Sequence, residues 1–329
     1  MTPTPTPTPT PTQPTIAAIV PCHNEEAAIG KVVRDLAAAL PSATIYVYDN
    51  ASTDATAEVA RAAGATVRTE TRVGKGNVIR RAFADLDADV YVLIDGDDTY
   101  DASRAAELVE ILFDGPYDQV LATRLKVTTT AYRPGHATGN HVLTEAVAVL
   151  FGRQSRVSDM LSGYRIFSRR FVKSFPALSA EFEIETEMTV HALRLRLPSV
   201  EVETDFKDRP VGSESKLRTY RDGWRILHLI ITLARRERPA LFHALLSTLL
   251  ALVAIALGTP IVIEYLHTGL VPRFPTAILA AAIATIAALV LMVGYVLDAT
   301  AYQRQVSSRL TYLQYPAPSR PSAARDGAS

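Results

Sequence analysis

The sequence predicts an α/β fold with a mostly parallel, doubly wound sheet, followed by two helices that cross a membrane. Short apolar runs alternate with helix-like segments across residues 15–205, which is the pattern of repeated β–α units. Polar residues follow several of these runs, at the strand ends where open parallel sheets place their ligand sites. Near the C-terminus, two long stretches contain no Asp, Glu, Lys or Arg.

The strands and helices of this body are expected to alternate in chain order. The expected strands are residues 15–21, 44–50, 65–70 and 89–95. Helical segments separate them at residues 25–40, 51–64 and 76–86. Gly64 is placed to end the second helix. The last strand shows little polar alternation, as expected for a strand that is buried on both faces of a parallel sheet.

Residues 239–263 and 274–297 are the two charge-free stretches, and each is about long enough to cross a bilayer as a helix. The connector between them is short, so we expect a hairpin. Arginines lie outside both ends of the pair: Arg235, Arg236, Arg238, Arg304 and Arg309. The positive-inside rule therefore predicts a multi-pass cell-membrane protein with its N-terminal body and both termini in the cytoplasm. A buried helical hairpin in a soluble protein is the alternative.

Composition narrows the possible functions. Lys+Arg and Asp+Glu both number 34, so bulk electrostatic binding to nucleic acid is not expected. Cys22 is the only cysteine, which excludes an intrachain disulfide and a cysteine-based zinc site. The first fourteen residues, MTPTPTPTPTPTQP, are of low complexity and predict a disordered tail rather than a signal peptide.

An acidic cluster follows the fourth predicted strand in the stretch YVLIDGDDTYD, residues 91–101. It contains Asp95, Asp97, Asp98 and Asp101. Carboxylates this close repel one another unless a cation, or a ligand that carries one, lies between them. The alternative is a solvated turn in which Asp101 or Ser103 caps the next helix.

A second candidate segment is RVGKGN, residues 72–77. The chain has neither GxxxxGK[ST] nor GxGxxG, so a P-loop or dinucleotide turn is not indicated. The glycines nevertheless allow backbone amides to approach a phosphate, and Arg72 and Lys75 add positive charge beside a helix N-terminus. A plain turn is the alternative.

Four segments in this order resemble the GT-A-type glycosyltransferases of family 2: IVPCHNE (19–25), YDNASTD (48–54), RVGKG (72–76) and DGDD (95–98). The resemblance implies the GT-A (nucleotide-diphospho-sugar transferase) fold. It also implies that Asp95–Gly96–Asp97 is a DxD element, in which Asp95 faces the ribose and Asp97 binds a Mg²⁺ or Mn²⁺ that bridges the donor diphosphate, with Asp95 as a second candidate metal ligand. A hard divalent cation held by one or two carboxylates would neutralise the charge of that leaving group.

The resemblance places the nucleotide base and ribose against Pro21, Glu25 and Asp49. The complete set of expected donor-binding residues is Pro21, Asn24, Glu25, Asp49, Asn50, Arg72, Lys75, Asp95 and Gly96. Nucleotide sugars are therefore the expected donors, with UDP-sugars preferred over GDP-mannose.

Two later segments, DMLSGYRIFSRR (159–170) and RPVGSESKLRTYRDG (209–223), resemble the polyprenyl-phosphate glycosyltransferases, a group that includes dolichyl-phosphate mannose synthases. The acceptor would then be a lipid phosphate, which arginines bind through planar, charge-assisted forks. The candidate phosphate-binding residues are Arg124, Arg133, Arg165, Arg209, Ser215 and Lys216. Among them Arg165 has an alternative role, to brace the SGYR turn through Asp159.

Residues 214–238 interleave basic and apolar side chains and predict an interfacial amphipathic helix with Trp224 as its anchor. A core-facing helix is the alternative. The expected organisation is thus a tail (1–14), a catalytic domain (15–213), this helix, two membrane helices (239–298) and a cytoplasmic tail (299–329). Oligomers that form through the membrane helices are a further expectation.

A phosphate monoester is mostly dianionic at neutral pH, so it needs no dedicated base. Positioning and charge stabilisation should dominate, and the resemblance implies inversion at the anomeric carbon. The predicted catalytic residues are Asp97, Asp98, Arg124, Arg209 and Lys216. The glutamates of EFEIETE are assigned either to the sugar hydroxyls or to a solvated face: Glu183, Glu185 and Glu187.

The main alternative function is a membrane-anchored glycosyltransferase that acts on a hydroxyl of a glycolipid or lipid-linked glycan, with Asp98 as its base. A processive polysaccharide synthase is disfavoured, because the chain has no QxxRW element and two spans are too few for a channel. A non-enzymatic membrane scaffold that kept the fold is a third class.

Overall fold

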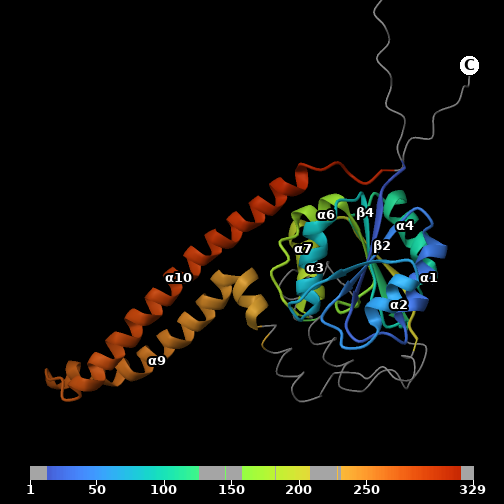
Figure 1. Ribbon diagram of the computed structural model, residues 1–329. Coiled ribbons are helices and arrows are strands. Elements are labelled where there is room, and N and C mark those ends of the chain that lie inside the picture. The colour runs from blue at the N-terminus through green and yellow to red at the C-terminus, as the bar shows by residue number, and fades with distance from the viewer. Residues whose placement is uncertain are drawn as a thin grey trace, which may run out of the picture. The chain divides into compact units, whose positions relative to one another are not determined.

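The computed structural model describes residues 13–125, 158–181, 183–207 and 231–319, together with residues 145 and 228 (Figure 1). The chain divides into two units. The first is an α/β unit that takes in most of the chain before residue 220 and also the chain from Ser308 onward. The second consists of residues 146–152 and 220–307, and its described part is mainly helical.

Seven strands of the described residues form one sheet in the order β3-β2-β1-β4-β6-β5-β7. Their bounds are β1 Ile16–Cys22, β2 Thr44–Asp49, β3 Thr66–Thr69, β4 Val90–Leu93, β5 Gln119–Leu125, β6 Arg165–Ser168 and β7 Ser199–Asp205. Strand β6 is antiparallel to both its neighbours, and every other pairing is parallel. The prediction of a mostly parallel, doubly wound sheet is confirmed, and the four predicted strands lie within two residues of their expected positions.

Helices cover both faces of the sheet (Figure 1). On one face lie α1 (Ile29–Ala39), α2 (Thr56–Ala62) and α4 (Ala105–Asp114), and on the other lie α3 (Lys75–Asp85), α6 (Arg169–Ser174) and α7 (Glu183–Leu195). Successive side chains of a strand point to opposite faces, so a strand buried on both faces needs apolar residues at nearly every position. Strand β4 meets this need with Val90 and Val92 in one core and Tyr91 and Leu93 in the other.

Helix α2 ends as the sequence predicts. Gly64 adopts a left-handed φ of 99°. Its amide donates to Arg61 O at 3.0 Å, and the amide of Ala65 donates to Ala60 O at 3.1 Å. These two bonds form a Schellman motif, which satisfies carbonyls at the end of the helix and turns the chain into β3.

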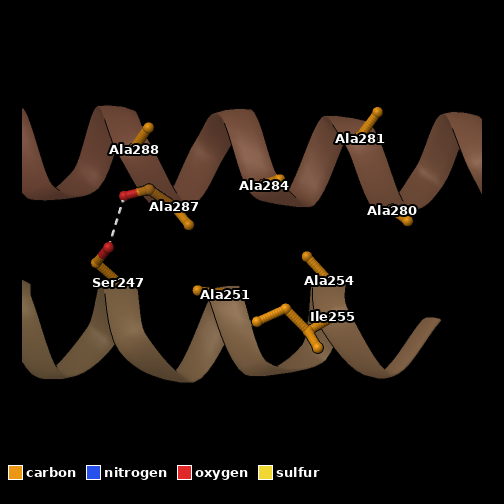
Figure 2. Close-up of a pocket in the computed structure, with 9 residues that line it drawn as sticks. All are labelled: Ser247, Ala251, Ala254, Ile255, Ala280, Ala281, Ala284, Ala287 and Ala288. Carbon is orange, nitrogen blue, oxygen red and sulfur yellow. Dashed lines mark hydrogen bonds between the residues drawn. The ribbon is translucent and has the colours of Figure 1, made fainter. Parts of the chain in front are cut away.

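The two expected apolar helices are α9 (Pro239–Thr268) and α10 (Phe274–Leu313), and both are long and apolar enough to cross a membrane. They lie side by side, with Ser247 Oγ donating to Ala287 O at 2.8 Å and small side chains facing each other (Figure 2). Many large apolar side chains are exposed, such as Leu249 at 59% and Leu252 at 58% exposure. This exposure disfavours the buried hairpin of a soluble protein and favours contact with lipid.

Helix α10 continues well past the expected end of the second span near residue 297. Its last residues belong to the α/β unit, where Tyr312 is 6% exposed and its hydroxyl donates to Asp118 Oδ2 at 2.9 Å. The Arg170 guanidinium lies over the Tyr312 ring at 4.7 Å. The segment predicted as a cytoplasmic tail therefore begins with a helix end packed on the α/β core. Of the expected interfacial helix, positions 228 and 231–237 are helical, and the remainder up to residue 230, with Trp224, lies outside the described residues.

Candidate active site

The candidate site lies at the carboxyl ends of the central parallel strands. Asp49 is the last residue of β2 and is in register with Cys22, the last residue of β1. Asp95 follows β4, on the other side of β1. Because these neighbouring strands are parallel, the polar residues that follow them meet at one edge of the sheet, as the sequence predicts.

Lys75 connects the RVGKG segment to the acidic cluster. Its Nζ lies 2.5 Å from Asp95 Oδ1 and 2.6 Å from Glu185 Oε1. The side chains of Lys75 and Glu185 are nearly buried. Burial by itself lowers the pKa of the Lys75 ammonium, but the two carboxylates outweigh burial and raise that pKa well above its usual range. Lys75 is therefore a fixed positive charge.

The remaining aspartates of the acidic cluster have separate partners. Asp97 is buried, and its Oδ1 accepts hydrogen bonds from the Thr99 hydroxyl at 2.6 Å and the Thr99 amide at 3.2 Å. Asp98 has a left-handed φ of 55° and pairs with Lys31 at 2.9 Å. Asp101 accepts from the Ser103 amide at 3.1 Å and caps a short 3₁₀ helix, Ala102–Arg104. The capping alternative thus holds for Asp101, whereas Asp95 and Asp97 remain at the site.

Two glycines allow the backbone to approach the site closely. A Cβ on Gly96 would lie 2.5 Å from Cys22 Sγ at the end of β1. A Cβ on Gly163, in the SGYR turn before β6, would overlap the Asp95 carboxylate and lie 2.7 Å from its Cγ. Both separations are shorter than van der Waals contact, so each position accepts only glycine without rearrangement.

The donor set fits a divalent cation that is shared with a substrate. Asp95 and Asp97 supply hard carboxylate oxygens, which Mg²⁺ and Mn²⁺ prefer. Within the described part of the chain, no group of three or more His, Cys, Asp or Glu side chains could hold a metal ion. Magnesium commonly binds through one or two protein carboxylates and completes its shell with substrate phosphates. The residues present therefore fit a cation carried together with a diphosphate.

Asp49 presents an unpaired acceptor at the same edge. Its carboxyl is buried, and Oδ1 has no hydrogen-bond partner among the described residues. A buried acceptor without a partner is costly, so such an atom usually marks a place where a ligand donates. The nearby Pro21 and Glu25 are half-buried at the end of β1, and the Glu25 amide donates to Thr56 Oγ1 at 2.8 Å.

The two asparagines expected at the nucleotide form hydrogen bonds with neighbouring loops. The Asn50 amide nitrogen donates to Glu70 O and Arg72 O at 2.9 and 2.8 Å, and its Oδ1 accepts from the Gly74 amide at 2.7 Å. Its side chain thus holds residues 70–74 in place, and its role at the nucleotide stays a prediction. Asn24 Oδ1 accepts from the Thr53 amide at 2.8 Å and joins the loops after β1 and β2. The Arg72 side chain is exposed at the start of the RVGKG loop.

Of the acceptor residues, Arg124 and Arg165 lie within the described part of the chain. Arg124 forms a fork with Asp159, at 2.6 Å from Nε and 2.7 Å from Nη2. Arg165 is fully buried and donates to Ser162 O, Met160 O and Thr189 Oγ1 at 2.8–2.9 Å. Burial lowers the pKa of Arg165 to about 10, so it stays charged at neutral pH.

The assignment of Arg165 to the acceptor phosphate is therefore corrected, because its donors are engaged and none of its surface is exposed. It does brace the SGYR turn, but through backbone carbonyls, since Asp159 is taken by Arg124. The other four candidates lie outside the described residues: Arg133, Arg209, Ser215 and Lys216.

The glutamates of α7 differ from one another. Glu183 is exposed, which matches the solvated-face interpretation. Glu185 is buried against Lys75, and Glu187 accepts from the amides of Leu178 and Ser179 at 3.0 and 2.8 Å. Sequence reasoning did not find the Lys75–Glu185 pair, because its members are far apart in the chain and no local spacing reports it.

Comparison with known proteins agrees with this geometry. Residues 17–175 match the sequence model of "Glycosyl transferase family 2". Glycosyltransferase AglJ of Haloferax volcanii is 33% identical over 256 residues, which cover 76% of this chain and 81% of that protein. The dolichyl-phosphate hexose transferase of the same organism is 29% identical over 229 residues, covering 68% and 95%.

The fold is also found in solved structures. Glucosyl-3-phosphoglycerate synthase from Mycobacterium tuberculosis, in complex with Mn²⁺, UDP and glucosyl-3-phosphoglycerate, superposes with a TM-score of 0.54 at 24% identity. The match covers 68% of this chain and 80% of that one. At this identity the likeness establishes the GT-A-like fold and nothing about the substrate.

Proposed function

The chain belongs to glycosyl transferase family 2, and from this premise we propose that it transfers a sugar from a nucleotide-sugar donor to the phosphate of a polyprenyl lipid. The observation that supports the proposal is the strand-end site, where Lys75 pairs with Asp95 two residues before Asp97, in a chain that also has two membrane-length helices. The relative that acts as a dolichyl-phosphate hexose transferase supports the choice of acceptor.

On the donor side, Asp49 would accept a hydrogen bond from the base or ribose, a role supported by its buried Oδ1, which has no partner among the described residues. Asp97 and Asp95 would hold the cation, Mg²⁺ or Mn²⁺, which when bound supplies positive charge to the leaving diphosphate. Lys75 adds a fixed positive charge beside it. A UDP-sugar is the donor expected first, and GDP-mannose is the alternative that the assay below compares with it.

On the acceptor side, a lipid phosphate oxygen attacks the anomeric carbon as the bond to the diphosphate breaks, and the bonding pair leaves with the diphosphate. The anomeric configuration inverts, so an α-linked donor yields a β-linked lipid phosphate sugar. Arg124, whose guanidinium is held by Asp159, would help to orient the phosphate. The product is a lipid-linked monosaccharide phosphate.

Asp98 helps to discriminate this acceptor from a hydroxyl. A hydroxyl acceptor needs a base, and Asp98 is the candidate for it, but its carboxylate is paired with Lys31 at 2.9 Å. A dianionic phosphate needs no base, so this pairing favours the phosphate acceptor. Transfer to a hydroxyl of a glycolipid or lipid-linked glycan is the second candidate.

The membrane arrangement is part of the proposal. Helices α9 and α10 would anchor the protein in the cell membrane, and by the positive-inside rule the flanking arginines would put the α/β unit on the cytoplasmic side. Residues 15–213 would form the catalytic domain, with the interfacial helix next to it in the chain. Oligomers through the membrane helices stay a prediction.

The experiment is a transfer assay with the detergent-purified full chain. Radiolabelled UDP-sugars and GDP-mannose are offered with Mn²⁺ and one of three acceptors: a short polyprenyl phosphate, the matching polyprenol, or diacylglycerol. We expect label to enter only the polyprenyl phosphate. Label in the polyprenol or diacylglycerol instead would establish the hydroxyl acceptor, and no label in any lipid would overturn the proposal.

A further inference from the structure

We propose that Glu185 is a positioning residue of the donor site, which holds Lys75 between two carboxylates and thereby preserves negative charge at Asp95 for a divalent cation. The inference rests on the proposed donor site and assigns a role to a residue of α7 that lies outside the strand-end motifs.

The contacts define a small charge balance. One ammonium, Lys75 Nζ, lies 2.5 Å from Asp95 and 2.6 Å from Glu185. Burial raises the pKa of the Glu185 carboxyl and the Lys75 ammonium opposes that rise; with Glu185 ionised beside Lys75, two negative charges share one positive charge. With Glu185 ionised, the positive charge of Lys75 neutralises only part of the negative charge of Asp95. If Glu185 were neutral, the Lys75 ammonium would pair with Asp95 alone and would neutralise its negative charge. A divalent cation would then meet a site that is one unit less negative.

The surroundings fix Glu185 in place. Thr189, one helical turn later, donates through Oγ1 to Glu185 O at 3.1 Å and accepts from the buried Arg165 guanidinium at 2.8 Å. Arg165 in turn holds the SGYR turn that lies against Asp95. Glu185 and Asp95 are therefore linked in two ways: directly through Lys75, and indirectly through Thr189, Arg165 and the SGYR turn.

The loop that precedes α7 also packs against the helix that carries Lys75. A Cβ on Gly76 would lie 2.7 Å from the backbone carbonyl carbon of Ala180, and the Asn77 amide donates to Ala180 O at 3.1 Å. Glu187 caps the same loop at Leu178 and Ser179. The distance from Glu185 to Lys75 is thus set by rigid elements, as a positioning role requires.

A direct contact of Glu185 with the sugar, the role considered from the sequence, is less consistent with this geometry. Glu185 is only 4% exposed, and one of its carboxylate oxygens is committed to Lys75. Its influence on a ligand would therefore pass through Lys75 and Asp95.

The test is Glu185→Gln in the full-length protein, with two binding measurements. The first is the Kd for Mn²⁺ alone, from the free-ion EPR signal. The second is the Kd for UDP without metal, from calorimetry. We expect Mn²⁺ to bind about tenfold more weakly, because the site loses negative charge, and metal-free UDP to bind equally or more tightly, because the diphosphate is an anion. A purely structural role would weaken both ligands together.

Glu183→Gln is the matched control, since it makes the same charge change at an exposed position of the same helix and should leave both constants unchanged. Lys75→Met removes a positive charge, so its effects on binding should be opposite: Mn²⁺ should bind more tightly and metal-free UDP more weakly. This variant also tests the inference if Glu185→Gln does not fold. Unchanged Mn²⁺ affinity in Glu185→Gln, or parallel weakening of both ligands, would overturn the inference.

The two proposals fail in different ways. If the wild-type protein binds neither Mn²⁺ nor UDP, the proposed donor site itself is wrong. If the wild-type protein binds both and transfers sugar, but Glu185→Gln leaves Mn²⁺ affinity unchanged or weakens Mn²⁺ and UDP together, only the role of Glu185 is wrong.

Discussion

Gly163→Ala tests the position of the Asp95 carboxylate, because it should displace this group without changing its chemical nature. Gly163 lies in the SGYR turn, and its amide donates to the Tyr100 hydroxyl at 2.9 Å. A Cβ at this position would overlap the Asp95 carboxylate and stand 2.7 Å from its Cγ. Since ordinary contact between carbon atoms begins near 3.5 Å, one side must move by about 1 Å.

The carboxylate is the side expected to move. The turn is held by Tyr100 and by the buried Arg165, whereas the Asp95 side chain is 28% exposed and has room to rotate. A shift of about 1 Å at a reacting centre costs on the order of 100-fold in rate. We therefore expect kcat/KM to fall about 100-fold, while overpacking of the turn costs roughly 1–3 kcal/mol of stability.

The assay is the initial rate of sugar transfer with varied donor and with varied lipid phosphate, together with the melting temperature. We expect kcat/KM for the donor to fall, while the KM for the lipid phosphate stays nearly unchanged. Gly258→Ala in α9 is the control, because there the nearest heavy atom would be 3.9 Å away. A folded Gly163→Ala variant that turns over donor at the wild-type rate would refute the placement of Asp95 in the site.

Three further predictions concern other parts of the molecule. Asp97→Asn should retain the fold but lose at least about 100-fold in metal-dependent transfer, measured at saturating Mn²⁺, because a carboxylate ligand becomes a neutral amide; activity at the wild-type level would remove the metal from this position. Tyr312→Phe should cost about 1.5–3 kcal/mol in denaturant unfolding, since the buried Asp118 carboxylate loses a donor, whereas Tyr302→Phe, exposed on the same helix, should cost little. Burial lowers the pKa of His191 from 6.5 to about 3. Between these two pH values His191 is protonated in the unfolded chain but not in the folded protein, so the free energy of unfolding should fall as pH drops below 6.5, by about 2 kcal/mol at pH 5. His191→Gln should flatten that decline, and an unchanged pH profile would contradict it.

Much of the fold and part of the site could be predicted because their signals are local. The strands are short apolar runs, Gly64 supplies the left-handed residue that ends α2, and the membrane-length helices are stretches without charge. The clustering of Asp49 and Asp95 at one edge follows from parallel neighbouring strands. In each case the spacing of apolar residues or the type of a single residue predicts the local structure to within a few positions.

The pairing of side chains could not be predicted in this way. Arg124 and Arg165 are both arginines near polar motifs, yet one forks with Asp159 and the other is buried with its donors on backbone and Thr189. Asn50 resembles a ligand residue but holds the RVGKG loop. Which partner each group takes depends on the strands that become neighbours, and no spacing along the chain encodes it.

The sequence by itself determined the α/β body, the acidic strand end and the apolar hairpin, because each arises from residues adjacent in the chain. Only the tertiary structure decided that Lys75 is shared between Asp95 and Glu185, and that Gly163 lies against Asp95. The physical reason is the sheet order: antiparallel β6 inserts beside β4, with Arg165 in register with Leu93, and so brings the SGYR turn to the acidic strand end.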